Sequence, residues 1–222
     1  MASPLAGLRQ AAVDPRQLAR QAMTNPRVLA TLIGGLEADE ARFKYGCAKA
    51  LRILSEQRPE LLYPHFDFFA RLLAHENKLL QWEAAFVLSQ LARVDTGDKF
   101  AGIFTRYFSP IPGPVMITAA TVIQGGARIA RAKPRLAERI AAEIRKVARA
   151  RYQTPECRNV AIGHAILALG DLFDQLDDPR PVLRFVRKQL NNPRPATRKK
   201  AAQFLKRVQS RVKRLPPSGL QP

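Results

Sequence analysis

Residues 60–91 read ELLYPHFDFFARLLAHENKLLQWEAAFVLSQL and show most clearly the pattern from which the fold can be predicted. Apolar side chains recur in it at spacings of three and four residues, first up to Leu73 and again from Leu79. The segment 74–77, AHEN, interrupts the pattern and ends in an asparagine. Such spacing puts apolar side chains on one face of a helix, and asparagine favours helix starts. The stretch therefore predicts two consecutive helices, 60–74 and 77–94.

The same periodicity extends in both directions along the chain. Segments rich in proline, glycine and asparagine end each apolar run after a few turns. We find no convincing alternating run and no Asn-Gly or Asp-Gly hairpin between β-branched segments, so strands are not expected. We predict an all-α chain with helices at 15–23, 26–34, 40–56, 60–74, 77–94, 98–108, 113–131, 134–151, 155–176, 180–190 and 194–213.

Alternate helices share a small residue that is followed by apolar residues three and six positions later. The anchors are Ala48, Ala85, Ala120 and Ala202, with Ala161 or Ala165 as the candidate between the last two. Ala48 and Ala202 are 154 residues apart, so four steps average 38.5 residues, close to the length of a helix-pair repeat. A small residue in mid-helix lets a neighbouring helix approach closely, so we expect these alanines in the core.

These residues resemble the HEAT-repeat family, an armadillo-type α-solenoid. The second helix of that family carries a polar or basic residue, then alanine, then two leucine-like positions. Segments 60–73 and 81–91 match a first and a second helix, and segment 192–208 matches a final second helix. The resemblance covers about residues 26–212. It implies a HEAT-like α-α superhelix of about five helix pairs, a curved right-handed stack that works by binding.

The pattern and composition of the chain predict a division into three parts. A rival all-α bundle without solenoid order stays open, and segment 110–114 is a candidate kink. The expected parts are a partly helical N-terminal segment 1–25, a repeat solenoid 26–213 and a flexible proline-rich tail 214–222.

The sequence offers no motif for catalysis, metal binding or membrane insertion. Cys47 and Cys157 lie in apolar helical patterns, which predicts reduced thiols in a cytoplasmic protein. The histidines, His65, His75 and His164, do not form a zinc-ligand spacing with the cysteines. No phosphate-binding glycine loop is found, and no apolar run is long enough to span a membrane. We therefore expect no cofactor, no metal, no membrane contact and no enzymatic activity.

One enzymatic alternative stays open. Some DNA glycosylases that act on alkylated bases are built from HEAT-like helix pairs, with an acidic residue and aromatic side chains in a basic groove. Trp82 and Glu83 are the candidate pair here, although a packing role explains Trp82 better. The aspartates of segment 171–178 are interpreted as a helix end and its loop.

Positive charge is concentrated in the C-terminal part. The formal net charge is +19. Residues 1–126 hold 14 basic and 11 acidic side chains, whereas residues 127–222 hold 23 and 7, so the net charges are +3 and +16. Repulsion among so many positive charges destabilises a compact protein unless a polyanion neutralises them. We therefore expect the C-terminal part to bind a polyanion.

Basic side chains in this part fall on helix faces opposite the apolar ones. In helix 180–190 the expected apolar face consists of Val182, Leu183, Val186 and Leu190. The candidate contacts are Arg135, Arg139, Lys146 and Arg149, with Arg145 beside them, then Arg180, Arg184, Arg187 and Lys188, and finally Lys199, Lys200, Lys206 and Arg207.

Equivalent helices of a solenoid line up, so these stripes predict one continuous positive surface. We expect a monomeric binding scaffold that contacts the backbone of a nucleic acid, since few aromatic residues lie nearby to stack on bases. The alternative is a protein–protein adaptor that binds an acidic partner. Reversing Arg42, Lys49, Arg52 and Lys78 in the near-neutral part is expected to affect binding much less.

Overall fold

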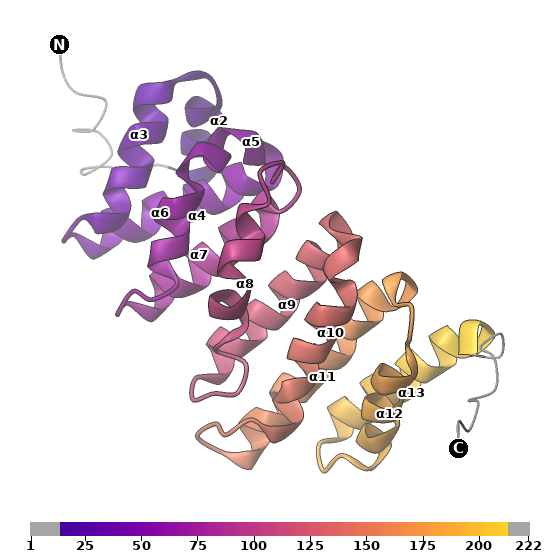
Figure 1. Ribbon diagram of the computed structural model, residues 1–222. Coiled ribbons are helices and arrows are strands. Elements are labelled where there is room, and N and C mark those ends of the chain that lie inside the picture. The colour runs from indigo at the N-terminus through magenta and orange to yellow at the C-terminus, as the bar shows by residue number, and fades with distance from the viewer. Residues whose placement is uncertain (1–13, 213–222) are drawn as a thin grey trace. The chain divides into compact units, whose positions relative to one another are not determined.

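The computed structural model describes residues 14–212, with side chains up to residue 209, and every regular element in that range is a helix (Figure 1). The all-α prediction is confirmed for these residues, and the predicted tail 214–222 lies outside them. The α-helices are α2 (Pro15–Thr24), α3 (Pro26–Gly34), α4 (Ala41–Gln57), α5 (Pro59–Leu62), α6 (Phe66–Leu72), α7 (Lys78–Leu91), α8 (Lys99–Phe108), α9 (Met116–Ala132), α10 (Ala137–Arg145), α11 (Pro155–Leu172), α12 (Arg180–Lys188) and α13 (Pro195–Val212). The 3-10 helices are η1 (Gly35–Glu37), η2 (Tyr63–His65), η3 (Pro134–Leu136), η4 (Lys146–Arg149), η5 (Phe173–Gln175) and η6 (Gln189–Asn191).

Side-chain caps fix several helix starts. Asp14, Asn25, Asn77 and Thr154 each accept a hydrogen bond from a backbone N–H in the first turn of the helix that follows. Proline occupies the first helical position after three of them, where no N–H is needed. Each cap contributes about 1 kcal/mol, and this local chemistry explains why the predicted starts agree with the structure.

The predicted helix 60–74 is interrupted. It consists of α5, η2 and α6, because Pro64 has no N–H to continue the α-helical ladder. The predicted helix 134–151 likewise begins with the 3-10 helix η3 at Pro134 and ends in the 3-10 helix η4.

The chain divides into two compact units, Met1–Ser109 (unit 1) and Pro110–Pro222 (unit 2). In unit 1, α4 packs against both α2 and α7, while α3, α5 and α6 contact these longer helices. In unit 2, α11 packs against both α9 and α13, while α10 and α12 contact each other and the longer helices. Each unit therefore has one layer of long helices in series and a second layer of shorter ones.

The unit boundary falls at the candidate kink, segment 110–114. The expected boundary between segment 1–25 and the solenoid is not a break in packing. Leu18, Ala19 and Ala22 of α2 are buried, and α2 packs against α4. The packed part of unit 1 therefore begins before residue 26.

Most of the predicted alanine anchors lie in the core. Ala48, Ala85, Ala120, Ala161 and Ala165 are all buried. The prediction for Ala202 is wrong, because Ala202 is exposed and its neighbour Ala201 is fully buried.

The register of α13 explains this correction. The buried side of α13 follows Thr197, Ala201, Phe204 and Val208, a helical spacing of four, three and four residues. The expectation for Leu190 is also wrong: it is 42% exposed, because η6 replaces the last α-helical turn of α12 and buries Gln189 instead.

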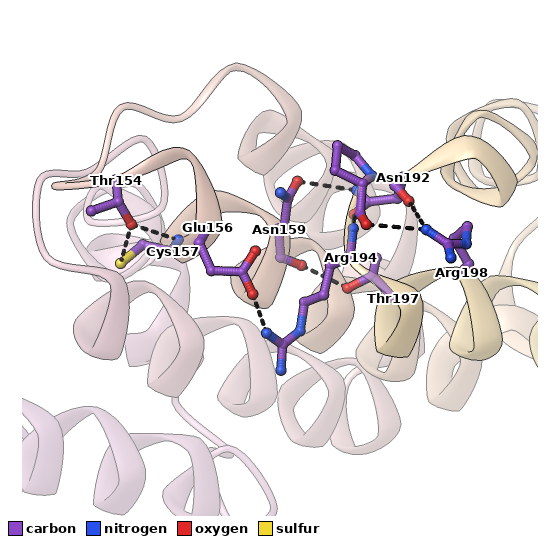
Figure 2. Close-up of polar contacts among 9 residues, drawn as sticks. Thr154, Glu156, Cys157, Asn159, Asn192, Arg194, Thr197 and Arg198 are labelled. Atoms are coloured by element: carbon purple, nitrogen blue, oxygen red, sulfur yellow. Dashed lines mark hydrogen bonds and ion pairs between the residues drawn. The ribbon is translucent and has the colours of Figure 1, made fainter.

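A polar network joins α11 to the loop before α13 (Figure 2). The Asn192 side-chain amide donates to Asn159 Oδ1 at 3.2 Å and to Gln189 Oε1 at 3.0 Å. The hydroxyl of Thr197 donates to the backbone carbonyl of Asn159 at 2.8 Å, and Arg194 forms an ion pair with Glu156. Asn192 and Thr197 are buried, so these bonds hold α13 in one register against α11.

Candidate binding surfaces

Five cationic side chains line a cleft of about 410 Å³ on α10, η4 and α12. They are Arg145, Lys146, Arg149, Arg184 and Lys188, and we call this site the basic cleft. No carboxylate is among its lining residues. Four of the five are predicted contact residues, and the fifth, Arg145, was expected on the same face.

Helical spacing explains why these cations gather. Ile140 and Ile144 of α10 are buried, as are Val182 and Val186 of α12. Since the apolar side of each helix is fixed in the core, the basic side must face outward. Because α10 and α12 contact each other, the two basic sides share one cleft.

The cations of the cleft are not equally engaged within the protein. Lys146 Nζ lies 2.7 Å from a carboxylate oxygen of Glu143, and Arg145 Nε donates to the carbonyl of Ala141 at 3.3 Å. Arg149, Arg184 and Lys188 are exposed, and no ion pair of theirs is found in the described part of the chain. These three carry charge that an anion from outside could neutralise.

The other predicted contact residues lie elsewhere. Arg180 is held by Asp178, whose carboxylate oxygen is 2.6 Å from Arg180 Nε, and this pairing lowers the pKa of Asp178 and raises that of Arg180. Arg135 and Arg139 are exposed and interact within the protein. Arg187 is exposed on α12.

The basic side chains of α13 do not line the basic cleft. Lys199 and Lys206 are exposed, whereas Lys200 and Arg207 line a different cavity, between α11 and α13. The basic side chains of α10 and α12 meet in the basic cleft, whereas α13 belongs to the layer of long helices.

Two adjacent cavities surround Leu167 on the layer formed by α9, α11 and α13. One has a volume of about 420 Å³ between α9 and α11, and the other about 170 Å³ between α11 and α13. Both are lined by Leu167 and Asp171, so they form one groove, which we call the Leu167 groove. The first is also lined by Gln124, Ala127, Arg128, Arg131, His164 and Ala168, and the second by Ile166, Lys200, Gln203, Phe204 and Arg207.

Glycines of α11 bring cations of α13 close to this groove. A Cβ at Gly170 would collide with the Arg207 guanidinium, and one at Gly163 would lie 3.3 Å from Lys200 Nζ. The ring of His164 is 3.1 Å from the side-chain amide of Gln124, and burial together with nearby Lys200 lowers the pKa of His164. Sequence reasoning missed this groove, and the two glycines seven residues apart were the available signal.

The candidate glycosylase pair is occupied by contacts within unit 1. Glu83 Oε1 lies 3.3 Å from Arg52 Nη1. Burial nevertheless raises the pKa of Glu83, because desolvation of its carboxylate outweighs the attraction to the half-exposed Arg52 guanidinium. The Arg52 guanidinium also stacks on Phe86, 3.7 Å from the ring centroid. Arg52 is therefore structurally engaged, and its reversal to glutamate would also disturb the packing of unit 1.

Other kinds of site find little support in the described residues. No group of three or more histidine, cysteine or acidic side chains within residues 14–209 is placed to hold a metal ion. No described helix is both long and apolar enough to cross a membrane.

Comparison with known proteins bears on the fold alone. No family model and no curated protein matches the chain. A similar solved structure is the crystal structure of an engineered protein from the Northeast Structural Genomics Consortium, with a TM-score of 0.54 and 15% sequence identity. The match covers 93% of this chain and 95% of the engineered one, so the likeness extends along nearly the whole length of both.

Proposed function

We propose that this protein is a non-enzymatic helical-repeat scaffold of the HEAT type that binds the sugar-phosphate backbone of nucleic acid through the basic cleft. The observation that carries the proposal is the lining of that cleft, five cations without a carboxylate. Positive charge at this density attracts a polyanion, and the bound polyanion would lower the repulsion among the cations of unit 2.

The chemistry of the cleft favours contacts with phosphates over contacts with bases. The aromatic residue in its lining, Phe185, is 8% exposed and packs in the core, so it offers little surface for a base to stack on. Arginine and lysine contacts to phosphate position a protein on nucleic acid without reading its sequence. Binding is therefore expected to be strong at low salt and nearly independent of sequence.

The layered packing within each unit supports the HEAT-type part of the proposal. A series of long helices, each covered by shorter ones, is the arrangement that stacked helix pairs produce. The buried alanines of α4, α7 and α9 are the small residues that such close stacking requires.

The test is a comparison of two variants that change the net charge equally. The cleft variant carries Arg149→Glu, Arg184→Glu and Lys188→Glu, all at exposed positions of unit 2. The unit 1 control variant carries Arg42→Glu, Lys49→Glu and Lys78→Glu, also at exposed positions. Binding of labelled duplex and single-stranded DNA and RNA is measured by fluorescence anisotropy at about 50 mM salt.

The cleft variant is expected to lose affinity by about tenfold or more for every nucleic acid tested, while the control variant loses much less. Equal losses in both variants would show that only the total charge matters. If the wild-type chain binds none of these nucleic acids, the proposal is wrong.

A further inference from the structure

We infer that the Leu167 groove is a second binding surface, and that it takes an acidic peptide segment with an apolar side chain at its centre. This inference goes beyond the proposed function, because the groove lies on α9, α11 and α13 and shares no lining residue with the basic cleft.

The groove has an apolar centre that the fold does not cover. Leu167 is 51% exposed, although most of the residues around it in α11 are buried. Ile117, 50% exposed, lies on the α9 face that continues through Gln124, since helical spacing places residues 117, 121 and 124 on one side. An exposed leucine between two cavities offers an apolar contact to a partner's side chain.

Cations flank this apolar centre on both sides. Arg131 of α9 lines the first cavity, and Lys200 and Arg207 of α13 line the second. Gly163 and Gly170 leave room for the two α13 cations to lie against α11. Charge complementarity therefore favours carboxylates on either side of the partner's apolar residue.

The groove differs from the basic cleft in ways that favour a peptide over nucleic acid. Asp171 lines both cavities, where it can accept a hydrogen bond from a peptide N–H, so the separate carboxylates of a peptide must lie at the flanking cations, whereas a continuous phosphate backbone would place a negative charge beside Asp171. The amide side chains of Gln124 and Gln203 can each donate and accept, as a peptide backbone requires. A partner with carboxylates, an apolar side chain and peptide N–H groups would satisfy all of these features together.

The experiment uses the full chain and three short fluorescein-labelled peptides. The first has a leucine flanked by glutamates, the second replaces that leucine by serine, and the third replaces the glutamates by lysines. We expect the first peptide to bind about tenfold tighter than either of the others, because only it matches both the apolar centre and the charge.

Two groove variants are paired with matched controls on the same helices or their neighbours. Leu167→Ser is compared with Leu190→Ser, since both leucines are exposed but Leu190 lies outside the groove. The double variant Lys200→Glu/Arg207→Glu is compared with the double variant Lys199→Glu/Lys206→Glu, whose two positions also lie on α13 but outside the groove lining. Each groove variant should weaken the first peptide about tenfold, and each control should leave it nearly unchanged.

The outcomes separate this inference from the proposed function. The cleft variant should keep its peptide affinity, and the groove variants should keep their duplex affinity. Equal binding of the leucine and serine peptides, or an unchanged affinity in Leu167→Ser, would overturn the inference. So would a loss of duplex binding in the Lys200 and Arg207 variant as large as its loss of peptide binding, because the groove would then be a nucleic-acid surface.

Discussion

Units 1 and 2 are built from the same kind of helix packing but differ in how they compensate charge. Unit 1 has 14 basic and 11 acidic residues, whereas unit 2 has 23 and 7. In unit 1 the cations Arg52, Arg58 and Lys99 each pair with a carboxylate. Unit 2 also has such pairs, as Lys146, Arg180 and Arg194 show, but it has too few carboxylates for its cations, and three of the five in the basic cleft form no ion pair within the described residues. This difference indicates that the buried apolar pattern sets the fold of each unit, while the charge on its surface can vary independently.

The units also differ in the polar groups that join their helices. In unit 1 the buried carboxylate of Asp95 accepts from the Tyr63 hydroxyl at 2.7 Å and from the backbone N–H groups of Lys99 and Phe100 at 2.8 and 3.0 Å. In unit 2 the neutral side chains of Asn192 and Thr197 form the hydrogen bonds that link neighbouring helices, both to Asn159 of α11. The buried contacts between α11 and the start of α13 therefore use neutral groups, and the ion pair between Arg194 and Glu156 lies closer to the surface.

The largest expected effect is the salt dependence of nucleic-acid binding. If each of the five cleft cations neutralises one phosphate, affinity for duplex DNA should fall roughly 500-fold between about 50 and 200 mM salt. The cleft variant should lose most of this dependence, and the unit 1 control variant should keep it. A titration of binding against salt measures the slope, and identical slopes in the two variants would contradict the contrast between the units.

The second-largest expected effect comes from removing the buried carboxylate of Asp95 in unit 1. Asp95→Ala should destabilise the protein by about 2 to 4 kcal/mol, because it leaves the Tyr63 hydroxyl and two backbone N–H groups without this acceptor. Asn192→Ala in unit 2 should cost about 1 to 2 kcal/mol, since only neutral bonds are lost. Urea unfolding followed by circular dichroism measures both. If Asn192→Ala costs as much as Asp95→Ala, the charged group of unit 1 and the neutral group of unit 2 contribute equally to stability.

Sequence reasoning succeeded where structure depends on local chemistry. Caps such as Asn25 and Thr154 and the spacing of Arg184 and Lys188 are properties of a single helix, so the helix starts and the basic side of α12 could be predicted. The Leu167 groove could not. Between Ala161 and Leu172 of α11 every residue is buried except His164, Leu167 and Asp171, and an apolar side chain such as Leu167 in a mostly apolar helix cannot be distinguished from a core residue by sequence. Which basic helices share a surface likewise depends on the layer to which each helix belongs.

The register of α13 provides a sharper test of the repeat in unit 2. Ala201→Phe should cost about 1 to 3 kcal/mol, because a large side chain must enter a closely packed contact. Ala202→Phe, one position further on the exposed side, should change stability by less than about 0.5 kcal/mol. Thermal unfolding compares the two directly. Equal costs would contradict the register of α13 in which Ala201 is buried and Ala202 exposed.

The smallest expected effect is a pH dependence that originates in unit 2. Burial and Lys200 disfavour the protonated form of His164 in the folded state, so its folded pKa lies below its unfolded value. Well above about pH 6.5 the ring is neutral in both states, and its contribution to stability is fully present. As the pH falls from there through the lower folded pKa, the unfolded state binds the proton first, so stability decreases. Arg131 and Asp171 share the cavity with His164, but His164→Gln leaves them in place and keeps an amide that can face Gln124. The unfolding free energy of wild type should therefore drop more than that of His164→Gln between about pH 7.5 and pH 5.5, and parallel curves for the two proteins would assign the dependence to other groups.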